Sequence, residues 1–283
     1  MRAYRWEVRK LIAQRRTFIG LGAAVLIPVL FATGLALSPP DGQRRGRTPD
    51  AGDVLVLAYN TSGLLLPFIG LAFASLVLLP LLAALVAGDI VASEDTGATL
   101  KTVLTRSTSR TTLLVAKMGA AATYIVVLLL VYGVSATLIG TIAVGAKPVT
   151  LGGPMGAAFF GAPTFSETSM LLRIALALAA YAAPLLAVSA WGFLLSTVTR
   201  NSSASIVGML VFSFVNQILR FIPNVPEAVG EWLLTDQFTA WQGALGATID
   251  WSALGRSTGV SALYLVVPLL VSLWWFRRRD VLV

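Results

Sequence analysis

Six long apolar stretches, separated by polar segments, dominate the pattern of the chain. They cover residues 17–37, 64–87, 118–140, 174–196, 206–222 and 260–276. A helix that crosses a bilayer needs about 20 mostly apolar residues. The pattern therefore predicts an all-α, polytopic integral membrane protein, with six transmembrane helices in one domain over residues 1–283. The fifth stretch contains Asn216 and Gln217 and runs into Arg220, so we expect it to be short, broken or in contact with a polar route.

The segment before the first apolar stretch, residues 1–16, has a helical pattern of its own. Tyr4, Val8, Leu11 and Ile12 share one face of such a helix, and the arginines share another. This arrangement is typical of a helix that lies flat in the membrane interface. The alternative is a solvated basic tail that only fixes the orientation of the first span.

Composition supports the membrane class and excludes several kinds of chemistry. The chain is 57% hydrophobic and 12% charged, with a mean hydropathy of +0.82, whereas soluble domains carry about 25% charged residues. It has neither cysteine nor histidine. Disulfides, thiolate or imidazole metal sites, and Ser-His or Cys-His nucleophile pairs are therefore excluded. An intramembrane enzyme is disfavoured because no acid pair lies in the middle of a span.

The distribution of lysine and arginine predicts the orientation. With the N-terminus inside, most of these residues fall in segments on the inner side, so we expect a multi-pass protein of the cell membrane with both termini in the cytoplasm. A basic cluster, Arg44, Arg45 and Arg47, lies in the first outer segment, beside three aspartates. The positive charge is thus explained by topology, and we expect no nucleic-acid partner.

One polar island, residues 88–117, lies between the second and third apolar stretches. It starts with acids at Glu94 and Asp95 and ends with Arg106 and Arg110, which suits the dipole of a helix between them. On that helix an apolar face is formed by Leu100, Val103 and Leu104. The island is predicted to be a compact docking element between two spans.

The order of residues in this island resembles the signature of exporter-type (type-2) ABC transporter permeases. In that family the pattern is roughly Glu-x-x-x-Gly-Thr-Leu-x-x-Leu-Leu-x-x-Pro-x-Ser-Arg, followed by a helix that opens with Lys. The chain matches it with Glu94, with 99–106, with Ser109-Arg110 and with Lys117. The chain departs from this pattern at two positions. Ala98 stands where the family usually has glycine, and the glycine of this chain, Gly97, lies one place earlier. Ser107 stands where the family usually has proline. The resemblance extends to the six-span plan and the flat N-terminal helix.

The resemblance implies that 88–117 is the coupling segment that fits a groove on a cytoplasmic ATPase subunit. The residues implied in coupling are Glu94, Asp95, Gly97, Leu100, Val103, Leu104, Arg106 and Arg110. The alternative is an ordinary amphipathic loop that rests on lipid headgroups.

The energy source is expected on another chain. No Gly-x-x-x-x-Gly-Lys-Ser/Thr loop occurs in the sequence, so nothing in it is typical of a phosphate-cradling site. By the resemblance, ATP and Mg²⁺ bind to a pair of separate ATPase subunits, and the permease works with a second copy or a homologous partner. The chain itself is expected to be a transport subunit that is not an enzyme and holds no cofactor.

Candidates for a translocation path come from polar and aromatic residues within the spans. They are Phe212, Asn216 and Gln217 on the fifth span and, because the resemblance implies that the second span lines the route, Phe68 and Phe73. The alternative for the amides is hydrogen bonding between helices. The segment 223–259 is expected to form short outer or re-entrant pieces or a plain outer loop.

These expectations together describe the permease subunit of an ATP-driven exporter. By the resemblance its cargo is a hydrophobic or amphipathic compound, such as a drug, antibiotic or lipid, that moves outward. The alternative is a secondary transporter driven by an ion gradient, which would need acids or other ion ligands near the middle of the membrane.

Overall fold

The fold is a bundle of long apolar helices. The computed structural model describes residues 2–37, 58–93, 109–150, 164–221 and 227–278. Within them five helices are long and apolar enough to cross a membrane, and one bent pair of helices passes the same test together. The chain is therefore a multi-pass membrane protein.

The described elements are helices and one pair of short strands. In chain order they are α1 (Arg2–Ala13), α2 (Arg15–Leu37), η1 (Gly63–Leu65), α4 (Leu66–Ala74), α5 (Leu78–Ala87), α8 (Arg110–Val144), β1 (Val149–Thr150), β2 (Thr164–Phe165), α10 (Glu167–Thr199), α11 (Ser202–Phe221), α12 (Glu227–Gly230), α13 (Leu234–Gln237), η2 (Ala240–Ala244) and α14 (Trp251–Arg278).

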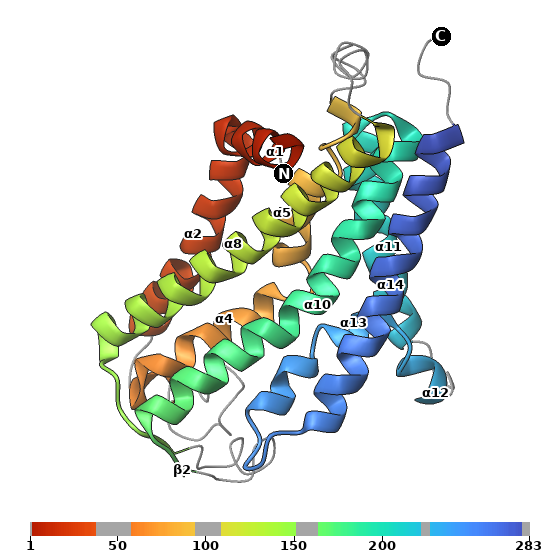
Figure 1. Cartoon of the computed structure of the whole chain (residues 1–283). Helices are drawn as coiled ribbons and strands as arrows, with labels where there is room; N and C mark the ends of the chain where they lie inside the picture. Colours follow the sequence, from red (N-terminus) through yellow and green to blue (C-terminus); the bar gives the residue numbers. More distant parts are fainter. Residues whose placement is uncertain (1, 38–57, 94–108, 151–163, 222–226, 279–283) are drawn as a thin grey trace.

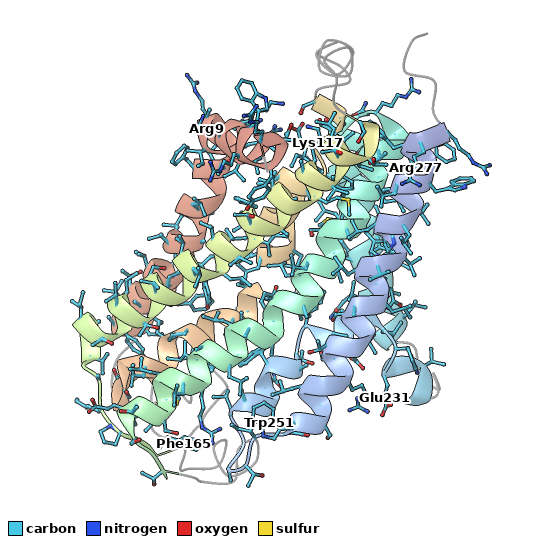
Figure 2. All side chains as sticks on the ribbon, viewed as in Figure 1. Arg9, Lys117, Phe165, Glu231, Trp251 and Arg277 are labelled. Atoms are coloured by element: carbon cyan, nitrogen blue, oxygen red, sulfur yellow. The ribbon has the colours of Figure 1, made fainter. Side chains whose placement is uncertain are left out.

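The bundle has two ends, each made of different elements (Figure 1). The α1 end comprises α1, residues 88–93, the start of α8, the junction of α10 and α11, and the end of α14. The opposite end, here the hairpin end, holds the antiparallel pair β1–β2, η1, η2 and the start of α14. Figure 2 shows Arg9, Lys117 and Arg277 at the α1 end, and Phe165, Trp251 and Glu231 toward the other.

The two longest helices extend well beyond the apolar stretches that predict them. α8 has 35 residues and α10 has 33, which at about 1.5 Å per residue exceeds the roughly 30 Å of a hydrocarbon core. Serine caps fix where they begin. Ser109 Oγ accepts from the amide of Thr112, and Ser166 Oγ accepts from the amide of Ser169. Both helices are therefore longer than the membrane core is thick.

The second apolar stretch is not one straight helix. Residues 64–87 are predicted as a continuous span, but the helices Gly63–Ala74 and Leu78–Ala87 meet at an angle of 69°. Pro80 removes one backbone donor just after the break and obstructs the preceding turn. The apolar pattern does not show the break, because Ser75 is the one polar residue near it and a single serine does not interrupt the run.

The N-terminal helix is confirmed, and most of its expected apolar face packs on the bundle. Leu11 is buried and Tyr4 contacts Thr123 of α8, whereas Ile12 is 57% exposed. Glu7, one turn from both Tyr4 and Leu11, is buried on the same side of the helix. The face that packs on the bundle thus combines apolar residues with one charged side chain.

α10 lies at the centre of the bundle and contacts α14, α11, α5 and α8. Its buried positions include many small residues, such as Ala177, Ala187 and Ala190. Small side chains let neighbouring helices approach closely inside a membrane. The Ala-rich fourth stretch therefore serves as the scaffold around which the other spans pack.

Arg173, near the start of α10, fastens the hairpin end. Its guanidinium donates to the carbonyl oxygens of Ala244 and, at 2.9 Å, of Gly246, and lies 4.0 Å from the centre of the Phe165 ring. Next to this clamp, Asp250 caps α14 by accepting from the amide of Ala253 at 3.0 Å. The expected short pieces after the fifth span are thus α12, α13 and η2, and η2 is held against α10.

Two backbones cross at Gly63 of η1 and Gly140 of α8. A Cβ atom added at Gly63 would lie 1.9 Å from the Gly140 carbonyl oxygen, and one added at Gly140 would lie 2.1 Å from that of Gly63. The amide of Gly63 also donates to Gly145 O at 3.0 Å. No side chain fits between the two chains at this point.

We predict that Gly63→Ala lowers the midpoint of thermal unfolding, followed by tryptophan fluorescence in detergent. Overpacking of this kind costs about 1–3 kcal/mol. Gly22→Ala is the matched control, since a Cβ there meets nothing within 4 Å and helix propensity favours alanine. Equal midpoints for Gly63→Ala and the wild type would mean that the crossing is looser than described.

Candidate functional site at the α1 end

Residues 88–93 join α5 to the part of the island that follows, and they are buried in the bundle. Ile90, Val91 and Ala92 are each no more than 5% exposed. The amides of Val91 and Ala92 donate to the hydroxyl oxygen of Ser196, at 3.3 and 3.0 Å. Ser196 lies near the end of α10 and is itself fully buried. The chain is therefore attached to the central helix before it leaves the described region.

Asp89 connects the same short segment to two further helices. Its carboxylate forms an ion pair with Arg16 at the start of α2 and accepts a hydrogen bond from Ser202 at the start of α11. Its backbone oxygen accepts from the amide and the hydroxyl of Ser93, at 3.0 and 2.8 Å. One acid thus holds α2, α11 and residues 88–93 together.

Lys117 of α8 makes the third connection. Its ammonium nitrogen lies 3.1 Å from Oε2 of Glu7 and donates to the carbonyl oxygen of Ile90, also at 3.1 Å. Lys117 is 1% exposed and Glu7 is 2% exposed. The other carboxylate oxygen of Glu7 lies 3.1 Å from Nζ of Lys10. Because two charges are removed from water together, each depends on the other remaining in place.

A second contact holds α1 on α8. The hydroxyl groups of Tyr4 and Thr123 are 2.6 Å apart, and Gly119 lies beneath the Tyr4 ring, where a Cβ would come within 3.3 Å of it. The N-terminal helix is therefore oriented by specific contacts with the bundle.

We call the contacts made by Ser196, Asp89 and Lys117 the α1-end network. These contacts surround the two points where the rest of the island joins the bundle. Residue 93 ends the segment that the network holds, and Ser109 caps α8, on which Lys117 lies two turns later. Among the described residues no group of three or more Asp or Glu side chains could hold a metal ion. The contacts of the α1-end network attach the chain to the neighbouring helices.

The residues implied in coupling fall almost wholly outside this description. Seven of them, from Glu94 to Arg106, lie in 94–108, beyond the described residues. Arg110 opens α8. The structure thus describes where their segment is attached and leaves their role a prediction.

The two path candidates of the bent pair lie on different surfaces. Phe68 is 5% exposed and its ring stacks on Trp241 of η2, with 6.1 Å between centroids. Phe73 is 53% exposed and lies 5.1 Å from the ring of Phe31 on α2. Phe68 is therefore part of the packing at the hairpin end, and Phe73 faces outward.

The three candidates on α11 lie within two turns of one another. Phe212 stacks on Trp191 of α10 at 4.6 Å. The Asn216 amide donates to the carbonyl oxygen of Phe212 in its own helix at 3.0 Å, while the side-chain oxygen of Gln217 is buried without a hydrogen-bond partner among the described residues. Asn216 thus bonds within its own helix, and the two amides differ in this respect.

An apolar pocket of about 480 Å³ lies elsewhere, between α8 and α10. Leu130, Val134, Leu171 and Leu178 contribute to its lining, and its one polar lining residue, Thr137, donates to Gly133 in its own helix at 2.7 Å. None of the five path candidates lines it. The sequence analysis did not single out this surface, because its lining has no polar or aromatic signal.

Sequence reasoning also missed the partners of the α1-end network. Glu7 is the one acid in residues 1–16, and an isolated acid in a basic helix was the available signal. Lys117 was noted only as the basic residue that opens the next helix. The pairing of two residues 110 positions apart leaves no local pattern.

We predict that Glu7→Gln lowers the unfolding midpoint strongly, because it removes the charge of the Glu7 carboxylate from the buried pair with Lys117, a loss of about 3–5 kcal/mol. The double variant Glu7→Gln/Lys117→Met should regain most of that stability. Glu231→Gln is the matched control, since the Glu231–Arg256 pair is 52% exposed on both sides and should contribute at most about 1 kcal/mol. If the two single variants behave alike, the buried pair does not hold α1 in place.

We also predict opposite effects of substitutions at the two amides of α11. Gln217→Leu should raise the unfolding midpoint, since it removes a buried oxygen that has no partner, whereas Asn216→Leu should lower it slightly by removing a hydrogen bond. Thermal unfolding of the purified protein measures both. A lower midpoint for Gln217→Leu would show that Gln217 bonds to a neighbouring helix, as the alternative reading holds.

Comparison with known proteins places the chain in a family without assigning its activity. A family model described as a protein of unknown function, DUF2705, matches residues 55–282. None of the curated proteins matches the chain. The matched range includes the bent pair, the α1-end segment 88–93 and every later span. The chain therefore belongs to the DUF2705 family.

Proposed function

We propose that this protein is the membrane permease subunit of an ATP-driven exporter, whose island between α5 and α8 receives force from a separate ATPase. The observation that carries the proposal is the α1-end network. Buried contacts fasten the chain on both sides of 94–108 to α1, α2, α8, α10 and α11. A segment that is pushed by a partner must be attached in this way if its displacement is to reach several spans at once.

Charge supports placing the α1 end in the cytoplasm. The side chains of Lys and Arg gather there, and the hairpin end has more acids than bases. The described residues on the elements at the α1 end are Arg2, Arg5, Arg9, Lys10, Arg15, Arg16, Arg110, Lys117, Arg200, Arg277 and Arg278 against Glu7 and Asp89, and those toward the hairpin end are Lys147, Arg173, Arg220 and Arg256 against Glu167, Glu227, Glu231, Asp236 and Asp250. By the positive-inside rule both α1 and the end of α14 are then cytoplasmic.

The partners follow from the resemblance of the island to the type-2 ABC permeases. We propose two cytoplasmic ATPase subunits that carry ATP and Mg²⁺, and a second permease that is either a copy of this chain or a homologue. The cargo is a hydrophobic or amphipathic compound moved outward. Gln217, whose side-chain oxygen has no hydrogen-bond partner in the described part of the chain, supports a polar contact with that cargo on α11.

A transporter driven by an ion gradient fits the described spans less well. Glu167, in the first turn of α10, is the one Asp or Glu within the helices and the bent pair that could cross the membrane. Coupling to an ion gradient usually requires acids deeper in the membrane. A transporter powered by ATP hydrolysis on a separate chain does not need such acids.

We predict that an ATPase chain copurifies with this protein from its native membrane in mild detergent and is lost from the Leu104→Asp variant. A charge at this position would disrupt the apolar face of the island. Ile12→Asp, a change at a residue of the α1 end that is 57% exposed, should retain the ATPase. Its absence from wild-type preparations, or its retention by Leu104→Asp, would contradict the proposed coupling.

A further inference from the structure

The break in the second span lies at residues 75–77, between α4 and α5. The two helices meet at 69°, and Val77 leaves the helical region with φ −129° and ψ −54°. Hydrogen bonding of the helical kind continues on both sides, from the amide of Ser75 to Leu71 O and from the amide of Leu81 to Val77 O, each at 2.9 Å. The bend is therefore confined to about one turn.

A proline alone does not account for this bend. Pro80 lacks the amide that would bond to the carbonyl oxygen of Leu76, which weakens the turn before it. Yet Pro28, Pro184 and Pro268 each lie inside a helix that continues without a break. Something else must stabilise the bent form at Pro80.

That stabilisation comes from Tyr181, on α10. Its hydroxyl donates to the carbonyl oxygen of Ser75 at 2.7 Å, at the start of the break, and the side chain is fully buried. Its ring packs on Phe238, with 5.8 Å between centroids. A carbonyl freed from its helix within a membrane must find a donor inside the protein, and Tyr181 supplies it in the bent form.

The outer arm of the break, η1 and α4, is firmly held by α8. Tyr132 donates to Pro67 O at 2.7 Å, and Gly70 leaves room for its hydroxyl, since a Cβ there would lie 2.5 Å away. The contact of Gly63 with Gly140 fixes the far end of the same arm.

The inner arm, α5, is held by weaker contacts of this kind. The Tyr124 hydroxyl donates to Leu82 O at 3.3 Å, which is long for a bond from a hydroxyl group. α5 also leads directly into residues 88–93, which the α1-end network attaches to α10, α2 and α11. The two arms thus belong to different ends of the molecule and differ in how tightly α8 holds them.

We propose that residues 75–77 form a hinge about which α5 moves relative to a fixed α4, and that Tyr181 is the latch that holds the bent state. Displacement at the α1 end then reaches the middle of the membrane through α5 and stops at the hinge unless the bond of Tyr181 to Ser75 opens. The hinge does not require an ATPase, so its test is independent of the proposed function.

Amide hydrogen exchange of the purified full chain in nanodiscs tests the hinge region by region. In Tyr181→Phe, loss of one buried hydrogen bond should speed exchange in 76–87 by about ten-fold, while 63–74 stays within about two-fold of the wild type. Pro80→Ala, which restores a donor to Leu76 O, should slow exchange in 76–87. Tyr264→Phe, on α14, is the control and should change neither region.

The outcomes separate a hinge from general instability. Faster exchange in both arms of Tyr181→Phe, to the same degree, would show that Tyr181 only supports the packing, and would overturn the proposal. Unchanged exchange in Tyr181→Phe, or faster exchange in 76–87 of Pro80→Ala, would overturn it as well.

Discussion

The buried ammonium group of Lys117 is the constraint on which the α1 end depends. A lysine that is 1% exposed is tolerated only where a counter-charge and further acceptors surround it. Glu7 and the carbonyl oxygen of Ile90 provide them, each 3.1 Å away. Because these partners lie on α1 and on residues 88–93, one side chain of α8 joins the N-terminal helix to the segment that follows α5. The ion pair of Arg16 with Asp89 extends the same attachment to α2.

In the middle of the bundle, buried polar groups likewise need partners within the protein. Where the second span breaks, the carbonyl oxygen of Ser75 accepts from Tyr181 of α10, because lipid offers no donor. Two tyrosines of α8 bond to the helices on either side, Tyr132 to Pro67 O of α4 at 2.7 Å and Tyr124 to Leu82 O of α5 at 3.3 Å. Specific contacts therefore hold both ends of the molecule, with one bent element between them. Such an arrangement suits a protein that passes movement from one side of a membrane to the other.

The class of protein could be predicted from the sequence, because apolar length is a local property. Five of the six predicted stretches lie in long helices, and the sixth forms the bent pair. The burial of Glu7 on α1 could not be predicted, because its partner Lys117 is distant in the sequence. The break could not be predicted either, since Pro80 is one of several prolines in the spans and its effect depends on Tyr181, about a hundred positions later. Apolar periodicity likewise gave no sign of the pocket between α8 and α10.

Crosslinking from residue 104 tests the central claim, that force enters through the island on the cytoplasmic side. The chain has no cysteine, so Leu104→Cys gives a single attachment point for a photoactivatable crosslinker in native membranes. The account predicts a crosslink to a nucleotide-binding chain and labelling by a membrane-impermeant maleimide only in inside-out vesicles. Labelling of intact cells by that maleimide, or crosslinks to lipid alone, would contradict it.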